Sequence, residues 1–479
     1  MKKLIYITSL SFYLFIQSLP VMSQDYLVDF VFLGSRSKFE LLILFGQAVD
    51  YDVDLYKVRY KTADANGQLD TASGLLVLPQ VPANTELPIV VYAHGTTSGP
   101  TDVPSQLRGG YEVAMAYAAS GFATVAPDYL GLGDARGFHP YLHAATEASA
   151  SLDMLFAGYE YLEFHDPDLD PNYLFLAGYS QGGHASMALH REIDQFWQII
   201  IPVTAATHMS GPYSISDVMR DRVLSDDSYG FPSYIAYIFL SYNDVYDIYG
   251  DLGEVFKEPF ATSIERFYNR EITLSQLNGM LIDALLDIAG DTIVKRMLQD
   301  SIVDVLTNDL NHPLNMALQE NDTYNWAPSS PTRLYYCGAD QQVPPRNSII
   351  ADSVMNALGA ADVQAINLNN SFDHGPCVFP AIMNSVEFFL SFVNPSSVDN
   401  PNGIEQLTVY PNPSVDEIVI DWENAASGFD YQIVNTKGQI VKKGSSSDNR
   451  IAVKEIPAGL YIVVCTADNE RRIARMFRR

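Results

Sequence analysis

Five consecutive residues decide the fold of this chain: Gly178-Tyr179-Ser180-Gln181-Gly182. They match the pattern G-x-S-x-G, in which a serine stands at a sharp turn between a strand and a helix. Residues 173–177 form a short apolar run typical of a buried parallel strand, and residues 181–196 have helical spacing without proline. Because the turn strains the backbone, its neighbours must be small, as these glycines are. The alternative is a glycine-rich turn whose serine has no chemical role.

A nucleophilic serine needs a histidine base and an acid, and in this strand-turn-helix setting they follow it in the order Ser, acid, His. The chain has nine histidines, and those before Ser180 are excluded by this order. Four others are set aside because they lie on the following helix, on the next strand or in a helical insertion: His184, His190, His208 and His312. His374 remains, in a loop between the strand-like residues 363–368 and the helical residues 378–392.

The acid should follow the preceding strand, residues 333–338, and Asp340 stands there. Asp373 is the alternative, but as the sequence neighbour of His374 its side chain should point elsewhere. In this arrangement His374 takes the proton of Ser180, and Asp340 orients the imidazole and stabilises its charged form. The sequence therefore predicts Ser180, Asp340 and His374 as catalytic residues.

An oxyanion hole is expected from two backbone N–H groups. One belongs to Gln181, the residue after the serine. The other comes from the loop after the apolar strand 88–94, where Thr96 is the first choice and Gly95 the second. We expect His94 to have a structural, hydrogen-bonding role.

Cysteine is scarce, and no metal-ligand spacing occurs, so neither a metal nor a cofactor is expected. Cys337 stands three residues before Asp340, and Cys377 three residues after His374. If these loops are neighbours, a disulfide would join them; two buried free thiols are the alternative.

The formal net charge is −28, and residues 404–479 carry ten acidic and ten basic residues, so the negative charge belongs to the part before them. Such a surface repels nucleic acid. Residues 1–23 read as a secretory signal, with an uncleaved anchor helix as the alternative. We expect no other apolar run to be long enough to span a membrane, and therefore no transmembrane anchor in the mature chain.

Strands alternate with helices along residues 24–394, which predicts an α/β domain with a mostly parallel sheet. It should open with a hairpin around Asn66-Gly67, whereas residues 38–44 are expected to be part of an amphipathic helix. Residues 212–330 interrupt the alternation as a helical cap. Residues 395–403 read as a linker, and residues 404–479 as a small β-sandwich.

The cap carries a run of aromatic residues: Phe231, Tyr234, Tyr237, Phe239, Tyr242, Tyr246 and Tyr249. We expect this run to line an apolar acyl pocket; the alternative is that it packs into a core of the cap itself.

The elbow, His94-Gly95-Thr96 and the order of the three residues resemble the α/β-hydrolase superfamily. More narrowly, residues 127–134 (PDYLGLGD) with 139–143 (HPYLH) resemble the secretory lipase family, which includes lipase A-like enzymes. This resemblance implies an α/β-hydrolase fold with a helical lid and activity on acyl esters. Asp128, Tyr129 and residues 139–143 precede the nucleophile, so we expect them to order the loop beside the pocket.

The tail resembles the C-terminal sorting domain of type IX secretion. The resemblance rests on residues 407–413 (LTVYPNP), 431–434 (YQIV), 437–441 (KGQIV) and 457–462 (PAGLYI) and on the basic end. It implies a Gram-negative bacterium, recognition by the type IX machinery, and release or attachment at the cell surface. A carbohydrate-binding module is the alternative, but Trp422 is the only tryptophan of this part.

Together these features predict an exported serine hydrolase of carboxylic esters, a lipase or carboxylesterase with a small-molecule ester or lipid substrate. Two other substrate classes remain open: feruloyl or acetyl esters linked to polysaccharides, and peptides. All of them are cleaved by the same acyl-transfer mechanism. A surface adhesion protein that retains the hydrolase fold is a further alternative.

Overall fold

The computed structural model describes residues 25–45, 49–82, 85, 87–165, 173–393, 407–411, 414–422, 428–435, 440–467 and 470–478. They form two compact units, one within Asp25–Gly403 and one within Ile404–Arg479. The expected signal segment and the expected linker lie outside the described residues.

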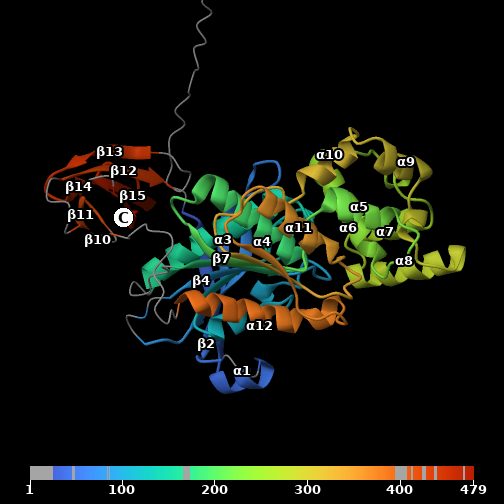
Figure 1. Ribbon diagram of the computed structural model, residues 1–479, viewed down its shortest axis with the longest axis horizontal. Helices are drawn as coiled ribbons and strands as arrows, with labels where there is room; N and C mark the ends of the chain where they lie inside the picture. The colour runs from blue at the N-terminus through green and yellow to red at the C-terminus, as the bar shows by residue number, and fades with distance from the viewer. Residues whose placement is uncertain are drawn as a thin grey trace, which may run out of the picture. The chain divides into compact units, whose positions relative to one another are not determined.

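A nine-stranded sheet in the order β1-β2-β3-β5-β4-β6-β7-β8-β9 forms the centre of the larger unit (Figure 1). Neighbouring strands from β5 to β9 pair in parallel, and β1, β2 and β3 add antiparallel partners at one edge. The strands are β1 Leu27–Arg36, β2 Val53–Ala63, β3 Leu69–Pro79, β4 Ile89–Ala93, β5 Ala123–Pro127, β6 Leu174–Tyr179, β7 Val203–Met209, β8 Thr332–Tyr336 and β9 Val363–Asn367. The expected hairpin is β2–β3, whereas β1 was not predicted.

Helices cover both faces of this sheet, so its central strands read as continuous apolar runs and every residue of β4, β5 and β6 is buried. On one face pack α1 Lys38–Phe45, α2 Tyr111–Ala119 and α12 His374–Val393. On the other pack α3 Ala144–His165, α4 Gln181–Glu192 and α11 Arg346–Ala357 (Figure 1). The predicted α/β-hydrolase fold class is confirmed.

Two helices differ from the expectation. Helix α12 begins at His374, four residues before its predicted start, and by length and composition alone it could cross a membrane. Its inner face packs into the core through Ala381, Val386 and Phe389. The expected amphipathic helix α1 buries only Leu41, and the side chains of Phe39 and Ile43 are exposed.

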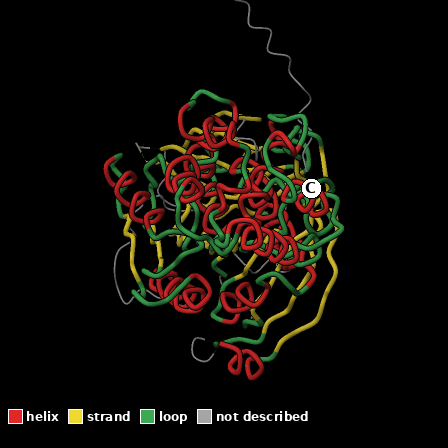
Figure 2. The backbone as a smooth tube through the Cα atoms, turned by 90° about the vertical axis from the view of Figure 1, so that its right-hand side faces the viewer, coloured by secondary structure: helices red, strands yellow, loops and turns green. Residues whose placement is uncertain are grey.

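Between β7 and β8 the chain forms a helical cap: α5 Arg220–Leu224, α6 Pro232–Tyr246, α7 Phe260–Tyr268, α8 Leu274–Ala289, α9 Asp300–Asn308 and α10 Pro313–Glu320. These helices share one apolar core, and they lie in front of the strands in Figure 2. The cap contacts loops that follow strands of the sheet: Leu274 donates its N–H to Ser98 O (3.0 Å), and Tyr229 donates its hydroxyl to Gln342 O (3.0 Å). It therefore covers the carboxyl ends of the strands, where α/β proteins bind ligands.

The smaller unit is all β. Two sheets, β10-β11-β14 and β13-β12-β15-β16, share one apolar core, as the predicted β-sandwich requires. Its strands are β10 Thr408–Tyr410, β11 Glu417–Asp421, β12 Phe429–Asn435, β13 Ile440–Ser446, β14 Arg450–Ala452, β15 Gly459–Ala467 and β16 Glu470–Arg478.

Candidate active site

Ser180 occupies the turn between β6 and α4 in a backbone conformation that few side-chain-bearing residues adopt, with φ 61° and ψ −123°. The flanking glycines are required by close packing. A β-carbon at Gly178 would lie 1.9 Å from Gly182 O, and one at Gly182 would lie 1.9 Å from Ala93 O. The turn therefore holds the half-buried Ser180 at the carboxyl end of the sheet.

His374 and Asp340 come from neighbouring segments that follow β9 and β8. His374 Nδ1 lies 2.6 Å from Asp340 Oδ2, and both side chains are buried. The other carboxylate oxygen of Asp340 accepts the N–H groups of Gln342 (3.0 Å) and Val343 (2.9 Å). With its carboxylate fixed in this way, Asp340 holds His374 with Nδ1 protonated and leaves Nε2 free to accept a proton.

The alternative acid, Asp373, has different partners. Its Oδ1 accepts the backbone N–H of Gln341 at 3.1 Å and that of His374 at 2.7 Å. Asp373 therefore satisfies one N–H group of the loop that follows β8 and one at the start of α12, and the imidazole of His374 is paired with Asp340 instead.

The elbow is joined to His374 through Tyr179. Its hydroxyl donates to His374 O at 2.6 Å, and the two rings pack with centroids 5.0 Å apart. Among the described residues, no hydrogen bond between Ser180 Oγ and His374 is formed. Such a bond often tightens only when substrate is bound.

A disulfide between Cys337 and Cys377 joins the loop of Asp340 to the helix of His374, with the two Cα atoms 6.0 Å apart. The structure thus favours the predicted bridge over two free thiols. Cys465, in the smaller unit, is buried and free.

Removal of this bridge is expected to lower stability. The two cysteines are 40 residues apart, and a loop of that length gives about 4 kcal/mol in the chain-entropy model. We expect the free energy of unfolding of Cys337→Ala/Cys377→Ala to fall by about this amount in denaturant titrations. Cys465→Ala is the control. An unchanged midpoint, or an intact mass that does not rise by about two daltons on reduction, would contradict the bridge.

The predicted oxyanion loop lies against the elbow. A β-carbon at Gly95 would meet Tyr179 O at 3.3 Å and Ser180 Cβ at 3.6 Å. Thr96 follows it, and Thr96 Oγ1 is hydrogen-bonded to Tyr141 OH at 2.9 Å. The fold thus brings the loop after β4 to the same turn as Ser180 and Gln181.

Several residues beside the elbow serve the structure. His94 Nδ1 pairs with Gly95 O (2.7 Å) and Nε2 with Asp128 O (3.3 Å), and burial lowers the pKa of His94. Asp128 accepts hydrogen bonds from Ser73 Oγ (2.6 Å) and Ser105 N (3.0 Å). These contacts agree with the ordering role predicted for this loop.

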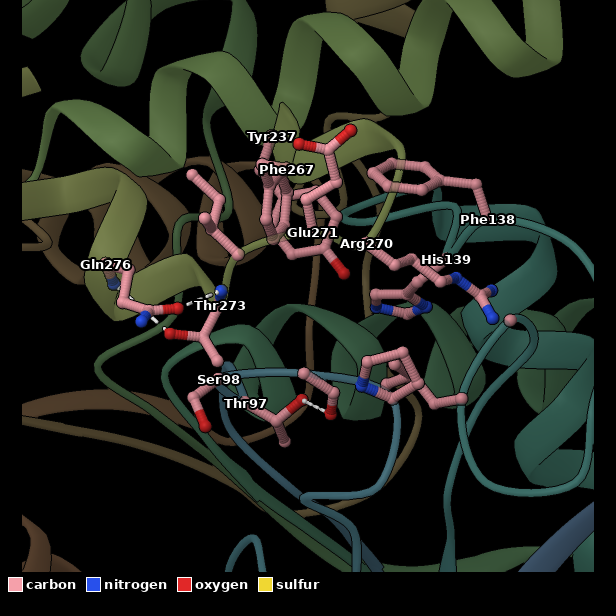
Figure 3. Close-up of a pocket in the computed structure, with 15 residues that line it drawn as sticks. Thr97, Ser98, Phe138, His139, Tyr237, Phe267, Arg270, Glu271, Thr273 and Gln276 are labelled. Carbon is pink, nitrogen blue, oxygen red and sulfur yellow. Dashed lines mark hydrogen bonds between the residues drawn. The ribbon is translucent and has the colours of Figure 1, made fainter. Parts of the chain in front are cut away.

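A cavity of about 160 Å³ lies between the loop after Thr96 and the cap (Figure 3). Thr97 and Ser98 form one side, and Tyr237 and Phe267 of the cap form the opposite side. Phe138, His139, Arg270, Glu271, Ile272, Thr273 and Gln276 also contribute.

All the residues of the aromatic run belong to or pack against the core of the cap, which is the alternative that the sequence left open. Tyr237 also lines the cavity, and an acyl-binding role for the run stays a prediction. Phe267 and Arg270 were missed by the sequence reasoning, because they lie on and just after α7, outside the aromatic run. Within the described part of the chain, no group of three His, Cys, Asp or Glu side chains is arranged to hold a metal ion.

Comparison with known proteins gives a family match for the smaller unit and structural matches for the larger unit. Residues 408–477 match the family model of the secretion system C-terminal sorting domain. No curated protein matches the chain in sequence.

Three solved structures are similar to the larger unit. A protein from Legionella pneumophila named as a hydrolase is 26% identical, with a TM-score of 0.71 over 78% of this chain and 100% of that one. The rice cell wall degrading esterase LipA from Xanthomonas oryzae is 25% identical, with a TM-score of 0.65 over 78% of this chain and 98% of that one. Candida antarctica lipase A, at 14% identity, shares the fold, with a TM-score of 0.59 over 79% of this chain and 84% of that one.

The sheet order, the elbow and these similarities define the larger unit as an α/β-hydrolase fold, and a helical cap is inserted between β7 and β8. In this chain the hydrolase unit is followed by a secretion system C-terminal sorting domain.

Proposed function

We propose that the chain is an exported serine hydrolase that cleaves carboxylic esters, with Ser180, Asp340 and His374 as its catalytic residues. The observation that carries this proposal is the 2.6 Å contact of His374 with Asp340, next to the strained turn of Ser180. Similarity to an esterase supports the choice of esters as the substrate class.

The reaction begins when Ser180 Oγ attacks the ester carbonyl carbon while His374 Nε2 takes the hydroxyl proton. The resulting tetrahedral intermediate collapses as His374 returns that proton to the leaving alcohol, and an acyl-enzyme remains on Ser180. Water then attacks the acyl-enzyme with His374 as the base, which releases the acid and restores the serine. Asp340 remains ionised and stabilises the imidazolium in both steps.

The negative charge of the intermediate would be met by the backbone N–H groups of Gln181 and Thr96. Each donor of this kind contributes roughly 3–4 kcal/mol of transition-state stabilisation. These donors are not removed by side-chain replacement.

The cavity beside Thr97, the residue after the expected oxyanion donor Thr96, would receive one arm of the ester. Its apolar surface fits an alkyl chain, which favours a lipase or carboxylesterase. Phe138, Tyr237 and Phe267 could equally enclose a phenolic ring, so aryl esters such as feruloyl groups are the second candidate.

We further propose that the sorting domain at residues 408–477 directs the chain to the type IX secretion machinery. The protein would then be released or attached at the cell surface.

Initial rates on p-nitrophenyl acetate through palmitate, methyl ferulate and an aminoacyl anilide test this proposal. A peak at an aliphatic ester supports the lipase or carboxylesterase, and a preference for ferulate supports the second candidate. Preference for the anilide would make the protein a peptidase. No turnover of any substrate would contradict the proposal and favour the adhesion protein.

A further inference from the structure

The side chain of Gln181 is buried and has two polar partners. Its Nε2 lies 2.8 Å from His139 Nε2 and 2.8 Å from Glu147 Oε1, and the side chain is 2% exposed. The two hydrogens of the amide are therefore both directed at acceptors. Gln181 is also the first residue of α4, and its backbone N–H is the expected oxyanion donor.

The protonation of His139 fixes the direction of this amide. His139 Nδ1 faces Leu130 O at 2.8 Å, so this nitrogen must donate. Burial lowers the pKa of His139 to about 3, which keeps the ring neutral. His139 Nε2 is then an acceptor, and the amide of Gln181 must present its NH₂ group rather than its oxygen to this nitrogen.

Glu147 is a buried carboxylate with a second partner, His184. Glu147 Oε2 lies 2.7 Å from His184 Nδ1, and the other ring nitrogen of His184 lies 2.8 Å from Asn321 O. Both ring nitrogens of His184 therefore face oxygen atoms, one of Glu147 and one of Asn321.

The same network reaches the cap. Asn321 ends α10, and its side chain accepts the N–H of Ala144 at 2.7 Å and donates to Tyr246 OH of α6 at 3.0 Å. Ala144 is the first residue of α3, the helix that carries Glu147. Gln181 is thus joined through Glu147, His184 and Asn321 to two helices of the cap.

We propose that Glu147 and His184 are positioning residues that hold the side chain of Gln181, and thereby fix its backbone N–H for the oxyanion. This inference rests on the proposed function. Neither residue touches the substrate; each acts through Gln181. A donor that is displaced from the oxyanion weakens only the transition state, so the effect should fall on kcat rather than on KM.

Kinetics of the full chain on the best p-nitrophenyl ester test the inference. We expect Glu147→Ala to lower kcat about 10- to 100-fold, with KM within about threefold of wild type, because small displacements of catalytic groups have costs of this size. Glu147→Gln should recover most of the loss, since its amide oxygen can accept from Gln181 and its NH₂ group can donate to His184 Nδ1. Active enzyme is counted by fluorophosphonate titration.

The matched control is Glu160→Ala. Glu160 is a second buried glutamate of α3, and it accepts the N–H groups of Tyr26 (2.9 Å) and Leu27 (2.7 Å). Its loss should lower stability and leave kcat unchanged. Gln181→Ala keeps the backbone N–H, and its kcat should fall as much as that of Glu147→Ala. If Glu147→Ala does not fold, Gln181→Ala is used in its place.

Three results would overturn the inference: unchanged kcat in Glu147→Ala or Gln181→Ala, a Glu147→Gln variant as impaired as Glu147→Ala, or an equal loss in Glu160→Ala. A wild-type protein without ester turnover would instead end the proposed function, and the inference with it. The wild-type arm therefore separates the two failures.

Discussion

Replacement of Ser180 by alanine is expected to lower kcat for ester hydrolysis by about 10⁴- to 10⁶-fold while the protein remains folded. The hydroxyl forms the covalent bond to the acyl group, and the residual rate would come from the oxyanion donors and from substrate binding alone. Steady-state kinetics with a p-nitrophenyl ester, beside circular dichroism of both proteins, measure the effect.

Ser120→Ala is a suitable control for this variant. Ser120 is a buried serine at the end of α2, and its hydroxyl donates to Ala116 O at 2.9 Å. The control should keep the wild-type kcat. Turnover retained by Ser180→Ala would mean that another group is the nucleophile.

Replacement of Asp340 by asparagine is expected to lower kcat by about 10⁴-fold. Gln342 and Val343 donate to Asp340 Oδ1, so the oxygen of an asparagine would take that place and its NH₂ group would face His374. The imidazole would then have to accept at Nδ1 and carry its proton on Nε2. In that tautomer it cannot take the proton of Ser180.

Asp373→Asn is the matched control, because Asp373 is the sequence neighbour of His374 and accepts only backbone N–H groups among the contacts of its carboxylate in the described structure. We expect its kcat to remain within a few-fold of wild type. If Asp373→Asn is as impaired as Asp340→Asn, the assignment of Asp340 as the catalytic acid is contradicted.

The central geometry could be predicted because it follows from local rules. A serine flanked by small residues between an apolar run and a helix specifies the turn, and here a β-carbon at Gly178 or Gly182 has no room. The chain order of the three groups then selects Asp340 and His374. In the fold, His374 Nδ1 lies 2.6 Å from Asp340 Oδ2. The roles of these residues in catalysis remain predictions.

Other parts could not be predicted because they depend on tertiary packing. Helix α1 has an apolar sequence, yet the side chains of Phe39 and Ile43 are exposed, since this short helix joins the core through Leu41 alone. Helix α12 begins at His374, two residues before Pro376. Because proline is tolerated in the first turn of a helix, Pro376 did not mark the start of α12.

The buried network around Gln181 has no sequence signature at all. Glu147 and His184 are 37 residues apart, and Asn321 lies a further 137 residues along the chain, at the end of the last cap helix. No local pattern relates these residues, and only the packing of α3, α4 and α10 brings them together. His184, which was set aside as the catalytic base because it lies on the helix after the elbow, belongs to the network that we propose to hold the expected oxyanion donor.

The central claim is that Ser180 forms the acyl-enzyme. Reaction of the protein with a p-nitrophenyl alkylphosphonate, followed by peptide mass analysis, tests it most directly, because this reagent leaves a stable adduct on the nucleophile. We predict release of one p-nitrophenol per chain, loss of ester turnover, and an adduct on the peptide that contains Ser180. An adduct on a different residue, or full turnover after Ser180 is modified, would contradict the account.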